Sequence, residues 1–350
     1  MLIGLLALVS FAHAAENVVF ITVDGVRYQE FFKGVRKPFR AHQKKGTPTF
    51  PLLHAAVDAG EGWIYGDESV GEKFWVGNKV AMSLPGYRSL LSGEFEDRCR
   101  SNRCAQTDRE TMIDSLARSG LKKEEVGVFA SWNKIDRAIE SLPSKIFKNI
   151  AFQDYPEVPT DAAEAAFVSD MTGKSRSDLP KWEDSRRDLY TYALGKNYLE
   201  KHRPRFLYLS FVDSDELAHR NDYRGYIDSV RQYDVWISEI RESLKAMGEY
   251  GENTSIVITT DHGRFVGPLW GQHGVGLRTG VSSFRTWAVV IPSLRMRESK
   301  IIAKRVGYRY DQLDIRPTIE GLLGMTSAPT ALRTGASLVN PAAEIDSLGK

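Results

Sequence analysis

The chain has 350 residues, of which 42% are hydrophobic and 26% are charged, and its 47 basic and 45 acidic residues leave a formal net charge of +2. This composition is typical of a folded globular protein and excludes a disordered chain, a collagen-like chain and a membrane protein with several spans. Because acidic and basic residues nearly balance, the chain lacks the excess of basic residues that is typical of proteins that bind nucleic acid.

The first fourteen residues form an apolar segment that contains no Asp, Glu, Lys or Arg and ends in Ala12-His13-Ala14. The segment is too short to span a bilayer, and its small-x-small ending is typical of a signal-peptide cleavage site. We therefore expect residues 1–14 to be a signal peptide and residues 15–350 to form a single domain. The mature protein would be periplasmic or secreted and would carry no transmembrane anchor. The alternative is that residues 1–14 form a first buried strand or helix.

Short β-branched runs alternate with segments of helical periodicity along the rest of the chain. The runs are residues 18–23, 126–130, 206–212, 256–260 and 287–291, and the helical segments are residues 110–118, 184–200, 226–247 and 312–323. Runs that are apolar throughout are typical of strands in a parallel sheet with both faces covered. The pattern predicts an α/β fold with a doubly wound, mainly parallel central sheet and helices on both faces. Residues 155–187 are polar without a clear period, and we expect an excursion on the rim of this sheet.

Three acidic residues stand at or just beyond the ends of three predicted strands. Asp24 ends the run FITVD, Asp261 ends the run VITTD, and Asp215 follows the third run within the segment DSDELAH. Because the carboxyl ends of parallel strands share one edge of a sheet, we expect these three carboxylates to converge there. Three carboxylates at one edge repel one another, so the pattern indicates a bound cation.

Three of the seven histidines lie close to these acids in the sequence. His219 follows Asp215 by four residues, which is a short chelating spacing. His262 directly follows Asp261, and His273 lies between glycines in the segment GQHG. Six nitrogen and oxygen ligands suit two borderline cations such as Zn²⁺, each with three protein ligands and an open position, although other divalent metals fit as well.

Ser83 opens the segment SLPGYRSLLSG, in which Pro85 and Gly93 bracket one short predicted helix. The N-terminus of a helix offers free N–H groups and a positive dipole end, which favour a phosphate group and an alkoxide. Beside a metal cluster, Ser83 is therefore the candidate nucleophile. The alternative is that Ser83 only caps this helix.

Cys99 and Cys104 are the only two cysteines, and they lie within the segment CRSNRC. In an exported protein two cysteines at this spacing usually pair, so we predict a disulfide that closes a small loop around Asn102. The alternative is two reduced thiols, which would follow if the protein were not exported.

In combination, these motifs resemble those of the alkaline phosphatase superfamily. The segments FITVDG, SLPGYRSLLSG, DSDELAH, TTDHG and GQHG stand in the order found in that superfamily, and the resemblance runs from residue 18 to about residue 323. The chain is most similar to the nucleotide pyrophosphatase/phosphodiesterase and phosphonoacetate hydrolase branches. The resemblance implies that residues 15–350 form a single alkaline phosphatase-like catalytic domain.

The resemblance also implies roles for individual residues. Asp24, Ser83, Asp261 and His262 would hold the zinc that activates the nucleophile, and Asp215, His219 and His273 would hold the zinc that activates the hydrolytic water. Members of the related branches place an Asn about twenty residues after the nucleophile to bind a phosphoryl oxygen, and Asn102 is similar in spacing. The phosphodiesterase branch usually has Thr as its nucleophile, so Ser83 departs from it, and substrate preference does not carry over.

Lys134 and Arg137 look similar to a Lys-x-Arg motif of some monoesterases in the superfamily, although they lie one residue further apart. Lys134 would then bind the dianion of a phosphate monoester. The alternative is a solvated start of a helix, with both side chains facing water and Trp132 forming a wall for an aryl group or nucleobase of a diester. The choice between monoester and diester stays open.

The sequence thus predicts an exported zinc-dependent hydrolase of small-molecule phosphoric esters that acts through a phosphoseryl intermediate. A first alternative is a sulfatase-like hydrolase of sulfuric esters, although the chain has Tyr87 where the sulfatase motif requires Arg. A second alternative is a non-catalytic binding protein on the same scaffold. The leaving group and the oligomeric state are left open.

Overall fold

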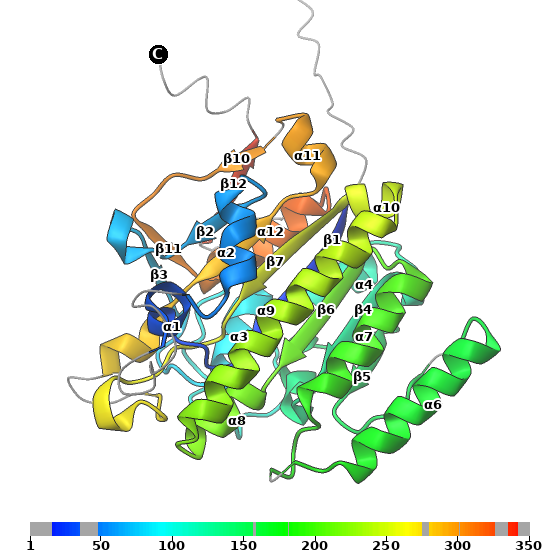
Figure 1. The fold of residues 1–350 in the computed structure, drawn as a ribbon, viewed down its shortest axis with the longest axis horizontal. Coiled ribbons are helices and arrows are strands. Elements are labelled where there is room, and N and C mark those ends of the chain that lie inside the picture. Colours follow the sequence, from blue (N-terminus) through cyan, green and yellow to red (C-terminus); the bar gives the residue numbers. More distant parts are fainter. Residues whose placement is uncertain are drawn as a thin grey trace, which may run out of the picture.

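The structure is a computed structural model that describes residues 16–35, 48–156, 159–180, 182–274, 280–300, 302–325 and 335–341 (Figure 1). The expected signal peptide, residues 1–14, lies outside the described residues. Within the described ranges, no helix combines the length and the apolar character needed to cross a bilayer.

A seven-stranded sheet forms the centre of the molecule, in the order β2-β9-β7-β1-β6-β4-β5. Its strands are β1 (Asn17–Val23), β2 (Trp63–Tyr65), β4 (Val126–Ala130), β5 (Phe147–Ile150), β6 (Phe206–Phe211), β7 (Thr254–Thr259) and β9 (Ala288–Ile291). Five consecutive strands of this sheet are parallel, in the order β7, β1, β6, β4 and β5. At the other edge, β9 runs antiparallel to β7, and β2 runs antiparallel to β9. The predicted α/β fold with a mainly parallel sheet is confirmed, and each of the five predicted runs overlaps a strand.

Helices cover both faces of this sheet (Figure 1). One face carries α2 (Pro51–Asp58), α7 (Asp188–His202) and α9 (Tyr223–Ala246), and the other carries α3 (Ser83–Ser92), α4 (Met112–Arg118), α5 (Asp136–Ile139) and α12 (Ile315–Leu322). Along β1, Val18 and Phe20 belong to the core beneath α3 and α12, while Val19 and Ile21 belong to the core beneath α7 and α9. Burial on both faces explains why the strand sequence is apolar without alternation.

Smaller elements surround this framework. They are a three-stranded sheet of β3 (Lys73–Trp75), β8 (Arg285–Thr286) and β11 (Arg309–Asp311), the antiparallel pair β10 (Ile302–Lys304) and β12 (Val339–Pro341), and the short helices α1 (Tyr28–Lys33), α8 (Asp213–His219), α10 (Glu249–Glu252) and α11 (Leu294–Glu298). Helix α8 follows β6 directly, so it begins at the carboxyl edge of the central sheet.

The polar stretch of residues 155–187 contains a helix that the sequence pattern did not indicate, α6 (Ala162–Ser177). This helix buries only Glu164, Val168 and Ser175, so it has no continuous apolar stripe that a periodicity search would detect. The chain then returns to the sheet, where the N–H of Asn133 donates to the carbonyl of Asp184 (2.9 Å) just beyond the end of β4. This pairing explains why the helix predicted from residue 184 begins only at residue 188.

Helix α3 lies against the chain that leaves β7. A Cβ atom built on Gly86 would come within 2.6 Å of the carbonyl oxygen of Asp261, so only glycine permits this approach. The close contact brings the N-terminus of α3 to the carboxyl edge of the sheet.

Gly86→Ala is therefore expected to lower the free energy of unfolding. The added methyl group meets backbone atoms, and overpacking of this kind costs about 1–3 kcal/mol. Gly173→Ala is the matched control, because Gly173 lies in α6 and none of the described residues comes within 4 Å of the added Cβ. That variant should gain up to about 1 kcal/mol from the better helix propensity of alanine. Equilibrium urea unfolding measures both changes, and a stabilised Gly86→Ala protein would contradict the close approach.

Candidate metal and nucleophile site

The three acids expected to converge lie on neighbouring strands of the central sheet. Asp24 directly follows β1, Asp261 lies two residues beyond the end of β7, and Asp215 lies in the first turn of α8 after β6. Strands β7 and β6 flank β1 on either side. The N–H of Gly25 donates to Oδ1 of Asp261 (3.0 Å), which ties the ends of β1 and β7 together. All three carboxylates are buried.

His262 lies at the centre of this group, and its side chain is wholly buried. Its Nε2 is 3.4 Å from Oδ1 of Asp24, 3.4 Å from Oδ2 of Asp261 and 3.7 Å from Oδ1 of Asp215. One imidazole nitrogen therefore faces all three carboxylates.

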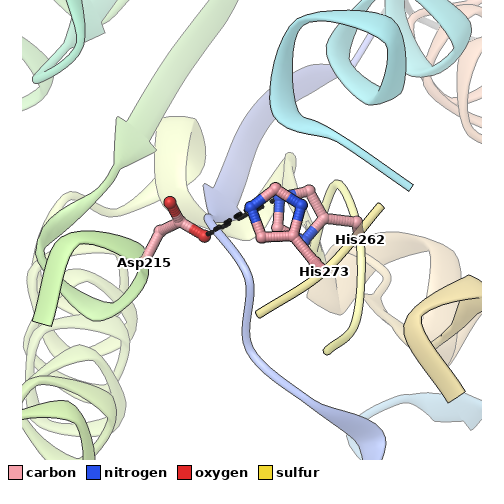
Figure 2. A group of neighbouring side chains, drawn as sticks. All are labelled: Asp215, His262 and His273. Atoms are coloured by element: carbon pink, nitrogen blue, oxygen red, sulfur yellow. Dashed lines mark ion pairs between the residues drawn. The ribbon is translucent and has the colours of Figure 1, made fainter. Parts of the chain in front are cut away.

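His273 and His219 extend the cluster toward solvent. The ring of His273 stacks on that of His262 with centroids 3.9 Å apart, and Figure 2 shows both rings facing the carboxylate of Asp215. Nε2 of His219 lies 2.9 Å from Nε2 of His273 and 3.1 Å from Oδ2 of Asp215. The side chain of His219 is 38% exposed, so the cluster opens to solvent at this residue.

Backbone carbonyls fix the tautomers of the two buried histidines. Nδ1–H of His262 donates to the carbonyl of Gly263 (2.9 Å), and Nδ1–H of His273 donates to the carbonyl of Ala81 (2.7 Å). In each ring the lone pair is consequently on Nε2, which faces the carboxylates. Histidines that bind metals are commonly oriented in this way.

Two carboxylate oxygens in the cluster have no hydrogen-bond partner among the described residues, Oδ1 of Asp24 and Oδ2 of Asp261. Burial, and next the charge of Asp261, raises the pKa of Asp24 well above its ordinary value, and burial raises the pKa of Asp261 as well. Burial lowers the pKa of His262, and burial lowers that of His273 well below the ordinary value. Neutral imidazoles beside unpaired carboxylate oxygens form a donor set that divalent cations bind.

Two overlapping groups of ligand atoms each lie within 4.8 Å of one another. The groups are Asp24, Asp261 and His262, and Asp215, His262 and His273. The first matches the expected first set of protein ligands, apart from Ser83. In the second, His262 takes the place expected for His219, although His219 lies within 3.1 Å of Asp215. The donor set thus fits divalent metal ions, and His262 lies between the two positions.

Ser83 is the first residue of α3, and its hydroxyl donates to Nε2 of His262 (3.3 Å). The preceding Met82 occupies the N-cap position without a side-chain hydrogen bond. Instead, Oδ1 of Asn102 accepts the N–H of Leu84 (3.0 Å), so Asn102 performs the capping that was the alternative role for Ser83. The Ser83 hydroxyl therefore faces the cluster.

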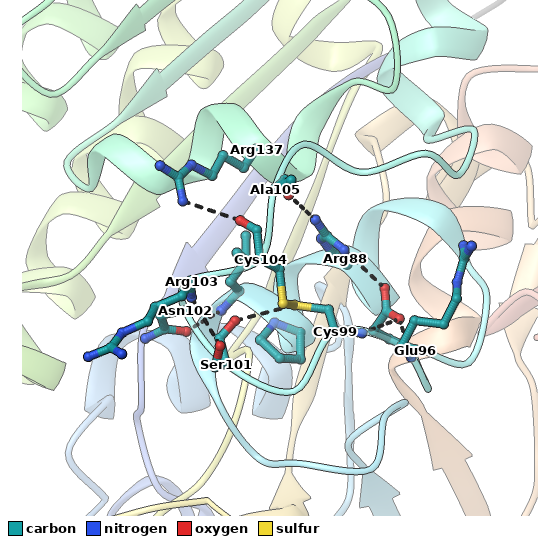
Figure 3. Close-up of a disulfide and its surroundings, with 12 residues drawn as sticks. Arg88, Glu96, Cys99, Ser101, Asn102, Arg103, Cys104, Ala105 and Arg137 are labelled. Atoms are coloured by element: carbon teal, nitrogen blue, oxygen red, sulfur yellow. Dashed lines mark hydrogen bonds and ion pairs between the residues drawn. A yellow bond between two sulfur atoms is a disulfide. The ribbon is translucent and has the colours of Figure 1, made fainter.

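The loop that carries Asn102 is closed by a disulfide between Cys99 and Cys104, as the sequence predicted (Figure 3). Arg137 holds this loop, because its Nη1 donates to the carbonyl of Cys104 (3.2 Å). Oε1 of Glu96 accepts the N–H of Cys99 (3.0 Å) from the other side. The disulfide loop thus brings Asn102 to the N-terminus of the helix that bears Ser83.

Lys134 lies outside the groups of ligand atoms. Its Nζ pairs with Oδ2 of Asp184 (3.0 Å) and sits 5.2 Å from the ring centroid of Trp132. Nε1 of Trp132 donates to the same oxygen of Asp184 (2.9 Å). Lys134 is thus paired with an acid and Arg137 with the disulfide loop, and binding of a monoester dianion by Lys134 stays a prediction.

Three residues that support the cluster were not identified from the sequence. The hydroxyl of Tyr87 donates to Oδ2 of Asp24 (3.0 Å), and Nε2 of Gln312 donates to the carbonyl of Thr260 (3.2 Å). Arg264 is buried and donates to Asp215. The sequence did hold signals for two of them, because Tyr87 follows Ser83 by one helical turn and Arg264 follows Asp261 by three residues.

Comparison with known families and proteins gives an independent view of the chain. A model of the Metalloenzyme superfamily matches residues 182–266, which include Asp215, His219, Asp261 and His262. Mouse (Mus musculus) GPI ethanolamine phosphate transferase 1 is 34% identical over 89 residues, which are 25% of this chain and only 9% of the mouse protein.

Solved structures share the fold across nearly the whole chain. Phosphonate monoester hydrolase from Silicibacter pomeroyi has a TM-score of 0.57 and 15% identity, covering 92% of this chain and 76% of that one. A protein of the alkaline phosphatase superfamily from Vibrio parahaemolyticus has a TM-score of 0.57 and 15% identity, covering 93% and 69%. A 2-O GAG sulfatase has a TM-score of 0.54 and 14% identity, covering 93% and 73%. The match to the Metalloenzyme superfamily model and the shared fold agree with the resemblance of the motifs to the alkaline phosphatase superfamily.

Proposed function

We propose that the protein is an exported phosphoric-ester hydrolase that uses Ser83 as nucleophile and two bound Zn²⁺ ions, or other divalent cations. One observation carries the proposal: the Ser83 hydroxyl, at the N-terminus of α3, lies 3.3 Å from Nε2 of His262. That nitrogen is 3.4 Å from each of two carboxylate oxygens that have no hydrogen-bond partner among the residues the structure describes. A serine hydroxyl is a weak nucleophile, and a neighbouring cation site is one of the settings that activates it.

The ligands in this proposal form two sets. Asp24, Ser83, Asp261 and His262 hold one cation, and Asp215, His219 and His273 hold the other. Bound cations would lower the pKa of the attacking groups and stabilise negative charge on the phosphoryl oxygens. The two geometric groups share His262, whose Nε2 binds only one cation, so the proposal gives His262 to the first set and His219, 3.1 Å from Asp215, to the second.

The residues of the chain have defined tasks in the reaction. The Ser83 oxygen, having lost its proton to solvent, attacks phosphorus as the ester bond breaks, and the departing alkoxide takes a proton from water. A water molecule then adds its oxygen to the phosphoseryl phosphorus, the bond to Ser83 breaks, and the serine is regenerated. The N–H of Ser83 at the start of α3 binds a phosphoryl oxygen, because the N–H of Leu84 donates to Asn102, that of Gly86 donates to Met82, and Pro85 has none. Because Oδ1 of Asn102 already accepts the N–H of Leu84, its amide NH₂ is the group that binds substrate.

Several observations support phosphorus chemistry and export. The mouse relative is named as a phosphate transferase, and one structural neighbour as a phosphonate monoester hydrolase. The disulfide supports export, because disulfides persist mainly outside the cytoplasm.

A sulfatase is the second candidate, since one structural neighbour is named as one. Here Tyr87, which occupies the position where the sulfatase motif requires Arg, is buried and donates to Asp24. Burial, and next the charge of Asp24, raises the pKa of Tyr87 well above its ordinary value, so the phenol stays neutral. The site therefore lacks the arginine charge at this position, which favours phosphate over sulfate esters as the first substrates to test.

Ser83→Ala is expected to lower kcat for an aryl phosphate by at least about 1,000-fold, because it removes the attacking oxygen. The fold should be preserved, since Asn102 rather than Ser83 caps the helix. Ser92→Ala, at the other end of α3, is the control and should keep kcat. Steady-state kinetics and circular dichroism measure both effects. A Ser83→Ala enzyme with near-normal kcat would exclude the covalent route.

The purified protein is expected to hold about two zinc ions per chain, and a chelator should abolish turnover until zinc is returned. Asp261→Asn should lower the zinc content to about one ion per chain, because a carboxylate ligand is lost. Asp234→Asn is the matched control: Asp234 also accepts backbone N–H groups, those of Leu52 (2.8 Å) and Leu53 (2.9 Å), but lies outside the cluster. Mass-spectrometric metal analysis gives the counts. Equal zinc contents in the wild type and Asp261→Asn would remove Asp261 from the ligand set.

Lys134→Ala is expected to lower kcat/KM for a phosphate monoester by about ten-fold or more if Lys134 binds the dianion, and to leave diester hydrolysis unchanged. Lys174→Ala is the control, because Lys174 is paired with Asp170 (2.7 Å) on α6 in the same manner as Lys134 with Asp184. A panel of an aryl monoester, a diaryl diester, a nucleotide and a sulfate ester provides the rates. Equal losses on both phosphate substrates, or none on either, would exclude Lys134 as a monoester selector.

A further inference from the structure

A guanidinium group lies inside the acid and histidine cluster. Arg264, two residues after His262, has a side chain with 0% exposure. It pairs with Oδ1 of Asp215, the oxygen that also faces Nε2 of His262 at 3.7 Å and Nε2 of His273 at 3.9 Å. A guanidinium group therefore shares an oxygen with one of the two candidate metal positions.

The same side chain connects three segments that carry candidate ligands. Its Nε donates to the carbonyl of Gly25 (3.1 Å), next to Asp24. Its Nη1 donates to the carbonyl of Gly271 (2.6 Å), two residues before His273. Its Nη2 donates to the carbonyl of Asp215 (3.0 Å) as well as to its carboxylate. These segments are far apart in sequence, and the planar fork of arginine binds all of them at once.

Tight packing holds the guanidinium in this position. Gly25 has φ +64°, and a Cβ atom there would lie 2.6 Å from Oδ1 of Asp215 and 2.8 Å from Nη2 of Arg264. Because Gly25 has no side chain, the ion pair between Arg264 and Asp215 occupies the space beside it.

The contacts are not shared equally between the two metal positions. For the position of Asp215 and His273, Arg264 binds the ligand carboxylate itself and the backbone that leads to the histidine. For the position of Asp24 and Asp261, it binds only the carbonyl of Gly25. Loss of Arg264 should therefore disturb the former position more.

We propose that Arg264 is a positioning residue that fixes Asp215 and the segment of His273 for one of the two cations, and that its charge offsets the repulsion among the three carboxylates. This inference rests on the metal site proposed above. Groups that orient metal ligands typically change metal affinity about 10–100-fold when they are removed.

Zinc binding to the full-length protein tests the proposal through two variants. Arg264→Lys keeps the charge but loses the fork, and Arg264→Gln loses the charge. Each is dialysed free of metal, checked by circular dichroism and titrated with zinc against a chromogenic chelator. We expect both variants to bind one zinc with an affinity close to that of the wild type, and the second at least about 10-fold more weakly.

Arg316→Lys is the matched control. Arg316 is also buried, and it donates to Ser92, Glu110, Ser115 and Glu320 away from the cluster. This variant should melt at a lower temperature than the wild type while both zinc affinities stay unchanged.

The outcomes are distinct. Two zinc ions bound with wild-type affinities by Arg264→Lys and Arg264→Gln, or an equal loss at both positions, would overturn the role of Arg264 and leave the proposed function intact. Failure of both variants to fold in excess zinc would assign Arg264 to the fold alone and would also overturn the proposal. A wild-type protein that binds no zinc or other divalent cation would overturn both proposals.

Discussion

Repulsion among three buried carboxylates is the constraint that shapes this protein. The strand order places Asp24, Asp215 and Asp261 at one edge of the sheet, where burial raises the pKa of Asp24 and of Asp261. The chain offsets part of that cost with a Gly25 N–H on Asp261, a Tyr87 hydroxyl on Asp24 and the Arg264 guanidinium on Asp215. Within the described part of the chain, Oδ1 of Asp24 and Oδ2 of Asp261 still have no hydrogen-bond partner, and each lies 3.4 Å from Nε2 of His262.

Distant parts of the chain keep this arrangement in place. Gln312 accepts the N–H of Gly77 (3.0 Å) and donates to the carbonyls of Thr260 and Asp261, so it links the chain before α3 to the chain after β7. The absence of a side chain at Gly86 then lets α3 approach Asp261. Together these contacts set the distance between the Ser83 hydroxyl and Nε2 of His262. Nucleophilic attack by Ser83, as proposed, would depend on this distance.

The strands and the convergence of the acids were predictable from the sequence. Runs that are apolar throughout indicate strands buried on both faces of a sheet. Acids that follow such runs are expected at the edge where the carboxyl ends of parallel strands meet. Helix α6 was not, since a helix that buries only three side chains leaves no periodic signal. The capping of α3 by Asn102 and the pairing of Lys134 with Asp184 depend on contacts 18 and 50 residues apart in the sequence. Such contacts exist only once the tertiary fold has formed, so local sequence patterns do not contain them. The order of the motifs, by contrast, can be read along the sequence, and the resemblance that it carries agrees with the metalloenzyme match and the shared fold.

For the two cations proposed above, the gradient of exposure across the cluster would have a kinetic consequence. Asp261 and His262 have wholly buried side chains, whereas the imidazole of His219 is 38% exposed. A chelator or a competing ion would therefore reach the position beside His219 first, and the inner position would exchange only after the outer one had emptied. Two cations held in this way would differ in residence time even if their affinities were equal, and loading of the site would be sequential.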